Sequence, residues 1–168
     1  MDNREADKRG SLPEGDNPPT IRSAEASDLD AIFLLEKSCF YDNWSRDSIA
    51  SELLDNRQTE CYVLEEGGRL LGYYFAWHIA GESSLNNIAV EEAERGKGYG
   101  KLLMEHFLGR AEEKGSEDLY LEVSTENRPA IALYQKYGFE RVGLRKNYYP
   151  KLHEDAYIMR KTEGGRSV

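Results

Sequence analysis

The stretch from Leu85 to Leu108 limits the possible folds of this chain more than any other part of the sequence. Its apolar residues from Ile88 to Val90 indicate the end of a strand, and glycines then occupy positions 96, 98 and 100. Beyond the glycines, apolar residues recur every four positions from Leu103, as the buried face of a helix requires. The stretch therefore predicts a strand, a glycine-rich turn and an amphipathic helix in direct succession.

Such a turn is suited to binding an anion. It leaves unpaired backbone N–H groups at the positive end of the helix dipole, and glycines let phosphate oxygens approach the backbone closely. The turn is not a Walker A loop, because no Gly-Lys-Ser/Thr ends it, and its glycines lack the G-x-G-x-x-G spacing of dinucleotide-binding folds. The alternative is a surface turn in which the glycines serve only as caps.

Charge and composition exclude several classes of protein. The formal net charge of −9 argues against general nucleic-acid binding, which needs a basic surface, and suits a basic peptide or protein as partner. No apolar run reaches transmembrane length and no signal-peptide core is present, so we expect a cytoplasmic protein that does not bind membranes. Cys39 and Cys61 lack the spacing of a disulfide framework or a zinc site and are expected to be reduced structural thiols.

We expect one folded domain from residue 20 to residue 161. Residues 1–19 combine charges with glycine and proline and have almost no apolar side chains, which is typical of a disordered tail. Residues 162–168 are also polar and are expected to form a flexible C-terminal tail. The 168 residues are enough for a proper core in a single domain, and no internal repeat is visible.

The order of expected elements is that of an α/β protein with a mixed central sheet flanked by helices. His78 has no carboxylate or nucleophile nearby in sequence and is interpreted as a structural or solvent-edge histidine. The expected elements are strands at 20–22 and 84–90, a helix capped by Ser27 that ends near Phe40, a helix capped by Ser45, a hairpin turning at 67–68, a helix from 101, a strand at 119–123, a helix from 127 to 138, a strand at 139–144, a loop at 147–150 and a strand at 156–159.

Four motifs together resemble the GNAT superfamily of acyl-CoA N-acyltransferases. Arg95-x-x-Gly98-x-Gly100 resembles the pyrophosphate loop of that family. After the strand Leu121-Glu122-Val123, the residues from Asn127 to Phe139 are similar to the family pattern N-x-x-A-x-x-L-Y-x-x-x-G-F. With Asn-Ile-Ala-Val at 87–90 and Arg-Lys-Asn-Tyr-Tyr-Pro at 145–150, the chain resembles the RimI branch, the N-terminal protein acetyltransferases, from about residue 20 to 161.

The resemblance implies the GNAT fold, whose central sheet splays between its fourth and fifth strands, and acetyl-CoA as co-substrate without a metal. The backbone of Ile88, Ala89 and Val90 would pair with the pantetheine arm as a further strand would. Asn127 would hydrogen-bond the coenzyme near its pantetheine end. The pyrophosphate would be cradled by the loop and the first turn of the helix, namely Arg95, Gly96, Lys97, Gly98, Tyr99, Gly100 and Lys101.

The same resemblance assigns Glu122 as general base and Tyr134 as general acid. Acetyl transfer needs a neutral amine to attack a thioester carbonyl and a proton for the departing thiolate. Glu122 stands among the apolar residues Leu119, Leu121 and Val123, where a carboxylate is out of place unless it faces a cleft. The open alternative is that Glu122 faces solvent on a strand of alternating apolar and polar residues. A phenol of pKa ~10 is protonated at neutral pH and can donate to a thiolate, although a tyrosine on an apolar helix can also be a core residue.

The acceptor is expected to be the free N-terminus of a protein, which in the RimI branch is a ribosomal protein. A peptide α-amine has a pKa near ~8 and a lysine near ~10.4, so deprotonating the lysine at neutral pH costs roughly 3 kcal/mol more. One carboxylate base fits the α-amine better. A lysine side chain, a small amine, or a non-catalytic acyl-CoA-binding subunit are the alternatives, and a monomer or weak homodimer is expected.

Aromatic side chains are expected to line the groove for the first residues of the acceptor, with acidic residues nearby favouring a basic second residue. For the two on the loop near residue 42, covering the core is an equally open interpretation. Ser124 and Asn86 depart from the RimI-like pattern, which often has an arginine and a bulky apolar residue at these positions, and both lie on the expected acceptor side. The groove residues are Phe40, Trp44, Tyr148 and Tyr149.

Overall fold

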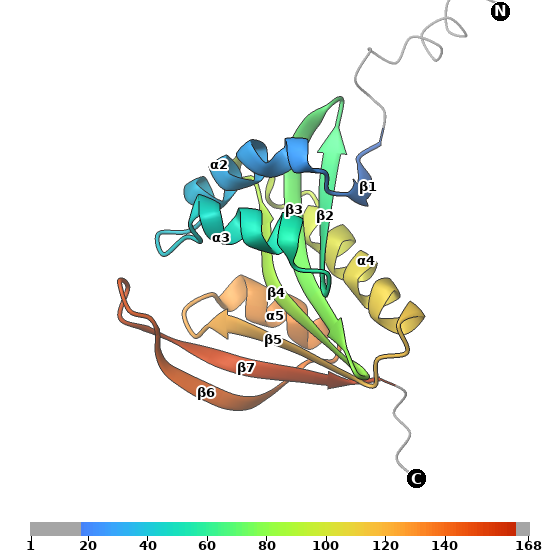
Figure 1. Cartoon of the computed structure of the whole chain (residues 1–168). Helices are drawn as coiled ribbons and strands as arrows, with labels where there is room; N and C mark the ends of the chain where they lie inside the picture. Colours follow the sequence, from blue (N-terminus) through green and yellow to red (C-terminus); the bar gives the residue numbers. More distant parts are fainter. Residues whose placement is uncertain (1–17, 164–168) are drawn as a thin grey trace, which may run out of the picture.

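The computed structural model describes residues 18–163, which contain one seven-stranded sheet in the order β1-β2-β3-β4-β5-β7-β6 (Figure 1). Neighbouring strands are antiparallel except β4 and β5, which run parallel. The expected mixed sheet is therefore confirmed. The strands are β1 (Thr20–Ser23), β2 (Thr59–Glu66), β3 (Arg69–Ile79), β4 (Glu82–Val90), β5 (Asp118–Ser124), β6 (Glu140–Tyr149) and β7 (Glu154–Thr162).

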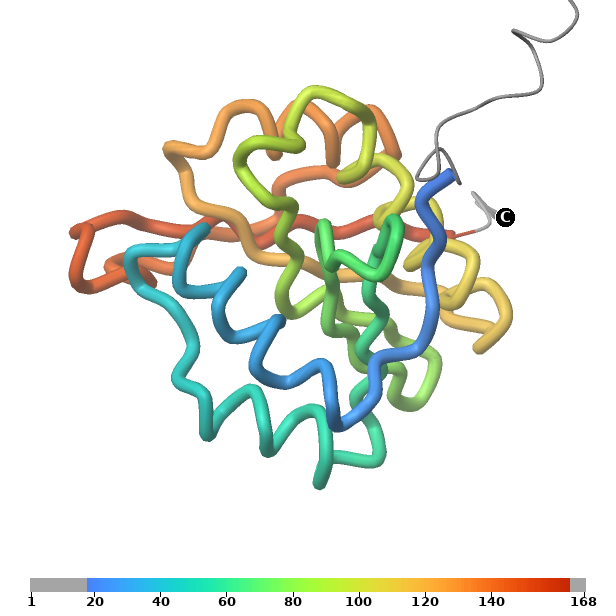
Figure 2. Tube along the Cα trace, turned by 90° about the horizontal axis from the view of Figure 1, so that it is seen from above, coloured from blue at the N-terminus to red at the C-terminus, as the bar shows by residue number. Residues whose placement is uncertain are grey.

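Helices cover both faces of the sheet, with α2 and α3 on one face and α4 and α5 on the other (Figures 1 and 2). The α-helices are α2 (Leu29–Cys39), α3 (Arg46–Ala50), α4 (Tyr99–Glu113) and α5 (Arg128–Lys136). Short turns extend this set: the 3₁₀ turns η1 (Ala26–Asp28) and η3 (Glu92–Glu94), and the π-helical turn η2 (Ser51–Asp55) that continues α3.

Side chains that alternate along the strands supply a separate core to each face. Beneath α4 and α5, the apolar side of β5 packs against the buried stripe of α4 and against α5; this core includes Leu103, Phe107, Leu119, Leu121, Val123 and Tyr134. Beneath α2 and α3, the core includes Ile32, Ile49, Val63, Tyr73 and Phe75. Strands β2, β3 and β4 supply side chains to both cores, and α2 and α4 pack on opposite faces of β3 and β4.

The parallel pair β4–β5 is joined over only part of its length. The two strands pair from Glu82 to Leu85, and Leu121 is the last residue of β5 in this ladder. At that point β4 carries a bulge at Asn86, because Ala76 of β3 pairs with Leu85 while the adjacent Phe75 pairs with Asn87. Beyond the bulge β4 follows β3 alone, and the sheet opens between β4 and β5, as the resemblance implied (Figure 1).

Several local predictions are confirmed. The Ser45 hydroxyl accepts a hydrogen bond from the Ser48 N–H at 3.0 Å and caps α3. Asn127 caps α5 through the Ala130 N–H at 3.3 Å, and Gly138 ends that helix with φ of +92°. The 67–68 hairpin joins β2 to β3, and both cysteines are free thiols.

Two local predictions are wrong. Ser27 does not cap the first helix, because η1 begins one residue earlier, where the Asp28 carboxylate accepts from the Glu25 N–H at 2.7 Å. The expected loop at 147–150 is largely strand, since β6 continues to Tyr149. There Asn147 adopts φ of +54° and donates its N–H to Asp155 at 2.7 Å. The pairing of β6 with β7 is interrupted between Arg145 and Tyr149 and resumes at Tyr149.

Most of the two expected tails, residues 1–17 and 164–168, lies outside the described residues. At the C-terminal side, β7 continues through Thr162, and the Glu163 N–H donates to the Glu117 carbonyl at 2.7 Å. Within 18–163, no helix has the length and apolar character needed to cross a bilayer.

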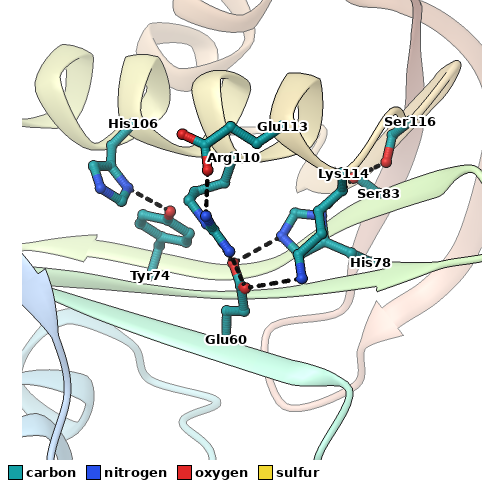
Figure 3. A network of polar contacts seen from close by, with 9 residues as sticks. All are labelled: Glu60, Tyr74, His78, Ser83, His106, Arg110, Glu113, Lys114 and Ser116. Carbon is teal, nitrogen blue, oxygen red and sulfur yellow. Dashed lines mark hydrogen bonds and ion pairs between the residues drawn. The ribbon is translucent and has the colours of Figure 1, made fainter.

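A polar network fixes α4 to β2 and β3 at the end of the molecule where β4 begins (Figure 3). Glu60 of β2 accepts two hydrogen bonds from Arg110, at 3.0 and 2.6 Å, and lies 3.2 Å from His78 Nε2. Burial disfavours the carboxylate, but the Arg110 hydrogen bonds hold the pKa of Glu60 below its usual value. His78 Nδ1 is 2.6 Å from the Ser83 hydroxyl. His78 is therefore structural, as interpreted from the sequence.

Candidate active site

The glycine loop joins the end of β4 to the start of α4. Gly96 and Gly98 have φ of +81° and +85°, and a Cβ on either would meet no described atom within 4 Å. These positions need glycine for the backbone conformation, because left-handed φ values are unfavourable for other residues. Gly98 is the N-cap of α4 without a side-chain cap, so the first turn, Tyr99 to Lys101, presents its N–H groups at the positive end of the dipole.

Two basic side chains of the loop are engaged within the protein. Arg95 Nε donates to the Val90 carbonyl at 3.2 Å, and Lys97 Nζ pairs with Glu94 at 2.6 Å. These contacts brace the loop against the end of β4 and against η3. The backbone N–H groups of the first turn of α4 stay available to contact an anion directly, which is the mode of binding that the glycines predicted. The binding itself stays a prediction.

The last residues of β4 present one edge without a partner strand. Ile88, Ala89 and Val90 pair with β3 on one side. On the other side, the pairing with β5 has ended at Leu85, so within the described chain no strand takes the backbone groups that face β5. An extended ligand that carries amide groups fits such an edge, as an added strand would.

Glu122 lies at the point where the sheet opens. It follows Leu121, the last β5 residue paired with β4, and it faces away from the α4 and α5 core. Its side chain is 24% exposed and is not free in solvent, because Arg145 Nε lies 3.0 Å from Oε1. Burial, and after it the Glu122 carboxylate, raises the pKa of Tyr148 to about 12. Glu122 therefore lies on the less buried face of β5, where Arg145 of β6 partly covers it.

Tyr134 belongs to the core and also contributes to this region. Its side chain is 6% exposed, packs edge-on against Phe139 at 6.2 Å, and burial raises the pKa of its phenol to about 12. The phenol is therefore protonated at neutral pH and can act as a proton donor. Burial, and less strongly the neighbouring Tyr148 and Glu122, raise the pKa of Tyr149.

The four expected groove residues come from two segments that the fold brings together. Phe40 and Trp44 lie on the α2–α3 loop, where both pack against the core, with the Trp44 ring 5.5 Å from Phe75. Tyr148 and Tyr149 lie at the end of β6 with their rings 4.8 Å apart and perpendicular. The half-buried rings of Phe40 and Trp44 cover the core, and their role as a groove wall stays a prediction.

An ion pair links the two groove segments. Asp42 of the α2–α3 loop lies 3.9 Å from Lys151 at the tip of the β6–β7 hairpin. Both segments project from the same end of the molecule (Figures 1 and 2). Ser124 projects on the same side of β5 as Glu122, and its hydroxyl donates to Glu154 at 2.6 Å.

Sequence reasoning missed Arg145, Asn87 and Glu36. Arg145 was part of a motif, but its contact with Glu122 depends on the β6–β7–β5 order of the sheet. Glu36 is 1% exposed in α2 and accepts hydrogen bonds from Asn87 and from the Trp44 N–H. The available signal was a charged residue four positions after Ile32 and one after Leu35, because that spacing places it on the buried face of the helix.

Other features of the described chain do not suggest a competing site. Residues 18–163 contain no group of three or more His, Cys, Asp or Glu side chains that could hold a metal ion. A hollow of about 380 Å³ lies between α5 and the β6–β7 hairpin and does not include Glu122; it is lined by Thr125, Arg128, Ile131, Gln135, Arg141, Tyr157 and Met159.

Comparison with known proteins identifies the family. The model of the acetyltransferase (GNAT) family matches residues 29–139. The chain is 37% identical over 139 residues to a Bacillus subtilis (strain 168) protein provisionally named ribosomal protein bS18-alanine N-acetyltransferase, covering 83% of this chain and 92% of that protein. It is 36% identical over 145 residues to the Escherichia coli (strain K12) ribosomal protein bS18-alanine N-acetyltransferase, covering 83% and 95%.

A solved structure extends the agreement to the fold. The crystal structure of the ribosomal-protein-S18-alanine N-acetyltransferase from Escherichia coli superposes with a TM-score of 0.81 at 32% identity, covering 90% of this chain and 99% of that one. The family match spans the glycine loop, Glu122 and Tyr134. The chain described here therefore belongs to the GNAT family of acetyltransferases.

Proposed function

We propose that this enzyme transfers the acetyl group of acetyl-CoA to the free N-terminal amine of a protein. The observation that carries the proposal is the position of Glu122, a partly enclosed carboxylate at the opening between β4 and β5, with the glycine loop at the end of β4. The loop and the open edge of β4 fit a ligand that combines phosphates with an amide-containing arm. Asn127, at the start of α5, would add a side-chain amide to that ligand.

In this mechanism Glu122 accepts a proton from the acceptor ammonium, directly or through a water molecule. The neutral amine then attacks the thioester carbonyl, and the Tyr134 hydroxyl supplies a proton to the departing thiolate. The acceptor ammonium would take the place that the Arg145 guanidinium holds beside Glu122 in the free enzyme. Since Arg145 is 57% exposed, displacing it into water costs little.

The chemistry of the site favours an α-amine over a lysine. One carboxylate base must deprotonate the acceptor, and an α-amine of pKa near ~8 loses its proton far more readily at neutral pH than a lysine near ~10.4. The aromatic rings of Phe40, Trp44, Tyr148 and Tyr149 would flank the first residues of the acceptor. The names of the relatives favour a ribosomal protein with an N-terminal alanine as the substrate.

The decisive assay measures CoA release from acetyl-CoA with short peptides. One peptide begins with a free alanine and carries an internal lysine; its matched control has the same sequence with a chemically blocked N-terminus. A second pair exchanges a lysine for a glutamate at position two. We expect turnover only with free N-termini, and more with lysine at position two, because the protein carries a net charge of −9.

The assay has outcomes that would refute the proposal. Turnover that survives blocking of the N-terminus would assign the enzyme to lysine side chains. Acetyl-CoA binding without turnover of any free peptide, with a small amine accepted instead, would remove the protein N-terminus as acceptor. Mass spectrometry of the product, which locates the added 42 Da on the terminal residue or on the lysine, decides between the two amines.

A further inference from the structure

The most unusual polar group outside the proposed chemistry is the Glu36 carboxylate. It is 1% exposed, in the third turn of α2, inside the core that α2 and α3 form with β3. Oε1 accepts the Trp44 N–H at 2.9 Å, while Oε2 accepts Asn87 Nδ2 at 2.7 Å and the Tyr73 hydroxyl. Within residues 18–163, no lysine, arginine or histidine lies within ion-pair distance of it.

A buried carboxylate without a cation is costly, and an apolar side chain would suit this core better if packing were its only role. The three donors that compensate it come from three different elements: β3, β4 and the α2–α3 loop. Asn87 directly precedes the open edge of β4, and Trp44 is in the loop that borders the groove. Glu36 therefore connects the proposed donor strand to the proposed acceptor wall.

The two sides of this connection differ in how much they depend on Glu36. Asn87 is held independently, because its strand pairs with β3 at Phe75 and on both sides of it. In contrast, the Trp44 N–H donates to Glu36 alone among the described residues. The Phe40 and Trp44 rings also pack against the core. Among the described residues, the other polar side-chain link from this loop to an element beyond α2 and α3 is Asp42–Lys151 at 3.9 Å; its lysine is 61% exposed, and such pairs contribute little in water.

We propose that Glu36 is a positioning residue that holds the α2–α3 loop in the conformation that receives the acceptor. The inference rests on the proposed function, because it requires the loop to border the acceptor groove. Loss of the Glu36 link lets the loop leave that conformation, and the apparent affinity for the acceptor falls in proportion to the fraction of competent enzyme. Bound acceptor restores the loop, so kcat is largely retained, and β4 keeps its ladder, so acetyl-CoA affinity does not change.

Two variants separate the geometry of this group from its charge. Glu36→Met fills the same space and accepts none of the three hydrogen bonds. The double variant E36Q/Y73F keeps a neutral version of the link: the glutamine oxygen accepts the Trp44 N–H, its NH₂ donates to Asn87 after the asparagine amide rotates, and the phenylalanine removes the third donor. Y73F alone is the matched control, since it removes one donor and leaves the Trp44 and Asn87 contacts in place.

We expect E36M to raise the acceptor KM about 10-fold or more, with kcat and acetyl-CoA Kd within about 3-fold of wild type. E36Q/Y73F and Y73F should stay within about 3-fold of the wild-type KM. An E36M enzyme with wild-type acceptor KM would overturn the proposal. So would an E36Q/Y73F enzyme as impaired as E36M, because the charge and not the hydrogen bond to the loop would then be responsible. Glu36→Ala, whose cavity admits water to the donors, replaces E36M if that variant does not fold.

Hydrogen exchange on the wild-type protein tests the same idea without a variant or an acceptor. The Trp44 amide should exchange at least about 10-fold more slowly than the exposed Tyr41 amide in the same loop, because it is hydrogen-bonded to a buried group. Equal exchange at the two positions would overturn the proposal. This readout also separates the two hypotheses: if no peptide is acetylated, the proposed function fails, whereas protection of Trp44 still reports on Glu36.

Discussion

Gly72 offers the sharpest test of how the sheet holds the open edge of β4. A Cβ at this position would lie 2.7 Å from the Ala89 carbonyl oxygen and 3.1 Å from Leu103 Cδ1. The oxygen belongs to the backbone of the expected pantetheine-binding segment, which cannot rotate away as a side chain could. Gly72→Ala must therefore push β4 away from β3, and the strand pairs Gly72–Val90 and Tyr73–Ala89 must lengthen.

The expected cost follows from this overlap. Overpacking by one carbon in a well-packed interior destabilises a protein by about 1–3 kcal/mol. For a domain of this size, each kcal/mol lowers Tm by about 2–4 °C, so G72A should melt about 2–12 °C below wild type. Because the displaced backbone is the proposed ligand edge, the rise in Tm on adding acetyl-CoA should also be smaller in G72A.

Gly109 provides a control of opposite sign. It is an exposed glycine in the interior of α4, and a Cβ there meets no described atom within 4 Å. G109A should therefore raise stability by about 0.5–1 kcal/mol, since alanine loses less backbone entropy in a helix. Differential scanning calorimetry with and without acetyl-CoA measures both variants. A G72A protein as stable as wild type would refute the assignment of the close contact, and a destabilised G109A would refute the reasoning from local space.

Further predictions concern catalysis, the glycine loop and pH. Glu122→Gln should lower kcat by about 10²–10⁴-fold with little change in the acetyl-CoA Kd measured by titration calorimetry, and intact turnover would remove Glu122 as base. Gly98→Val should weaken acetyl-CoA binding, because φ at this position is +85°. Its control is Gly81→Val in the β3–β4 turn, where φ is +84°: this variant should be less stable but bind acetyl-CoA as the wild type does. Equal losses of acetyl-CoA affinity in the two variants would refute a specific role for the loop. Burial lowers the pKa of His78 and of His106 in the folded protein. Below about pH 6.5 the unfolded chain therefore binds more protons than the folded protein, and the free energy of unfolding should rise from about pH 5 to pH 7. A Tm that does not change over this range would contradict the prediction.

The chemistry of the local segments was accessible from the sequence because each signal is short-range. The stripe that starts at Leu103 marks the buried face of α4, and Ser45 and Asn127 cap helices through contacts only three residues away. The glycine-rich turn before α4 was likewise predicted from residue type, whereas the left-handed conformations of Gly96 and Gly98 come from the structure. The cap of the first helix was predicted wrongly, because more than one nearby residue could serve as the cap. Ser27 was expected to cap the helix, but Glu25 and Asp28 form the capping contacts.

The contacts that complete the site are long-range, and no local pattern specifies them. Arg145 meets Glu122 only because β7 is inserted between β5 and β6, and the Asn86 bulge is defined by how β4 pairs with β3. Glu36 reaches Asn87 across 51 positions of the chain.

The sequence by itself determined the strand–glycine turn–helix unit, the Ser45 cap and the family, because these depend on residues within one or two turns of each other and on several motifs found together in one chain. Only the tertiary structure decided that the sheet opens after Leu85, that Glu122 faces Arg145 and Tyr148, and that Glu36 joins the α2–α3 loop to β4. The physical reason is that these features arise from strand order, register and the burial of polar groups, which are properties of elements packed together and not of any one segment.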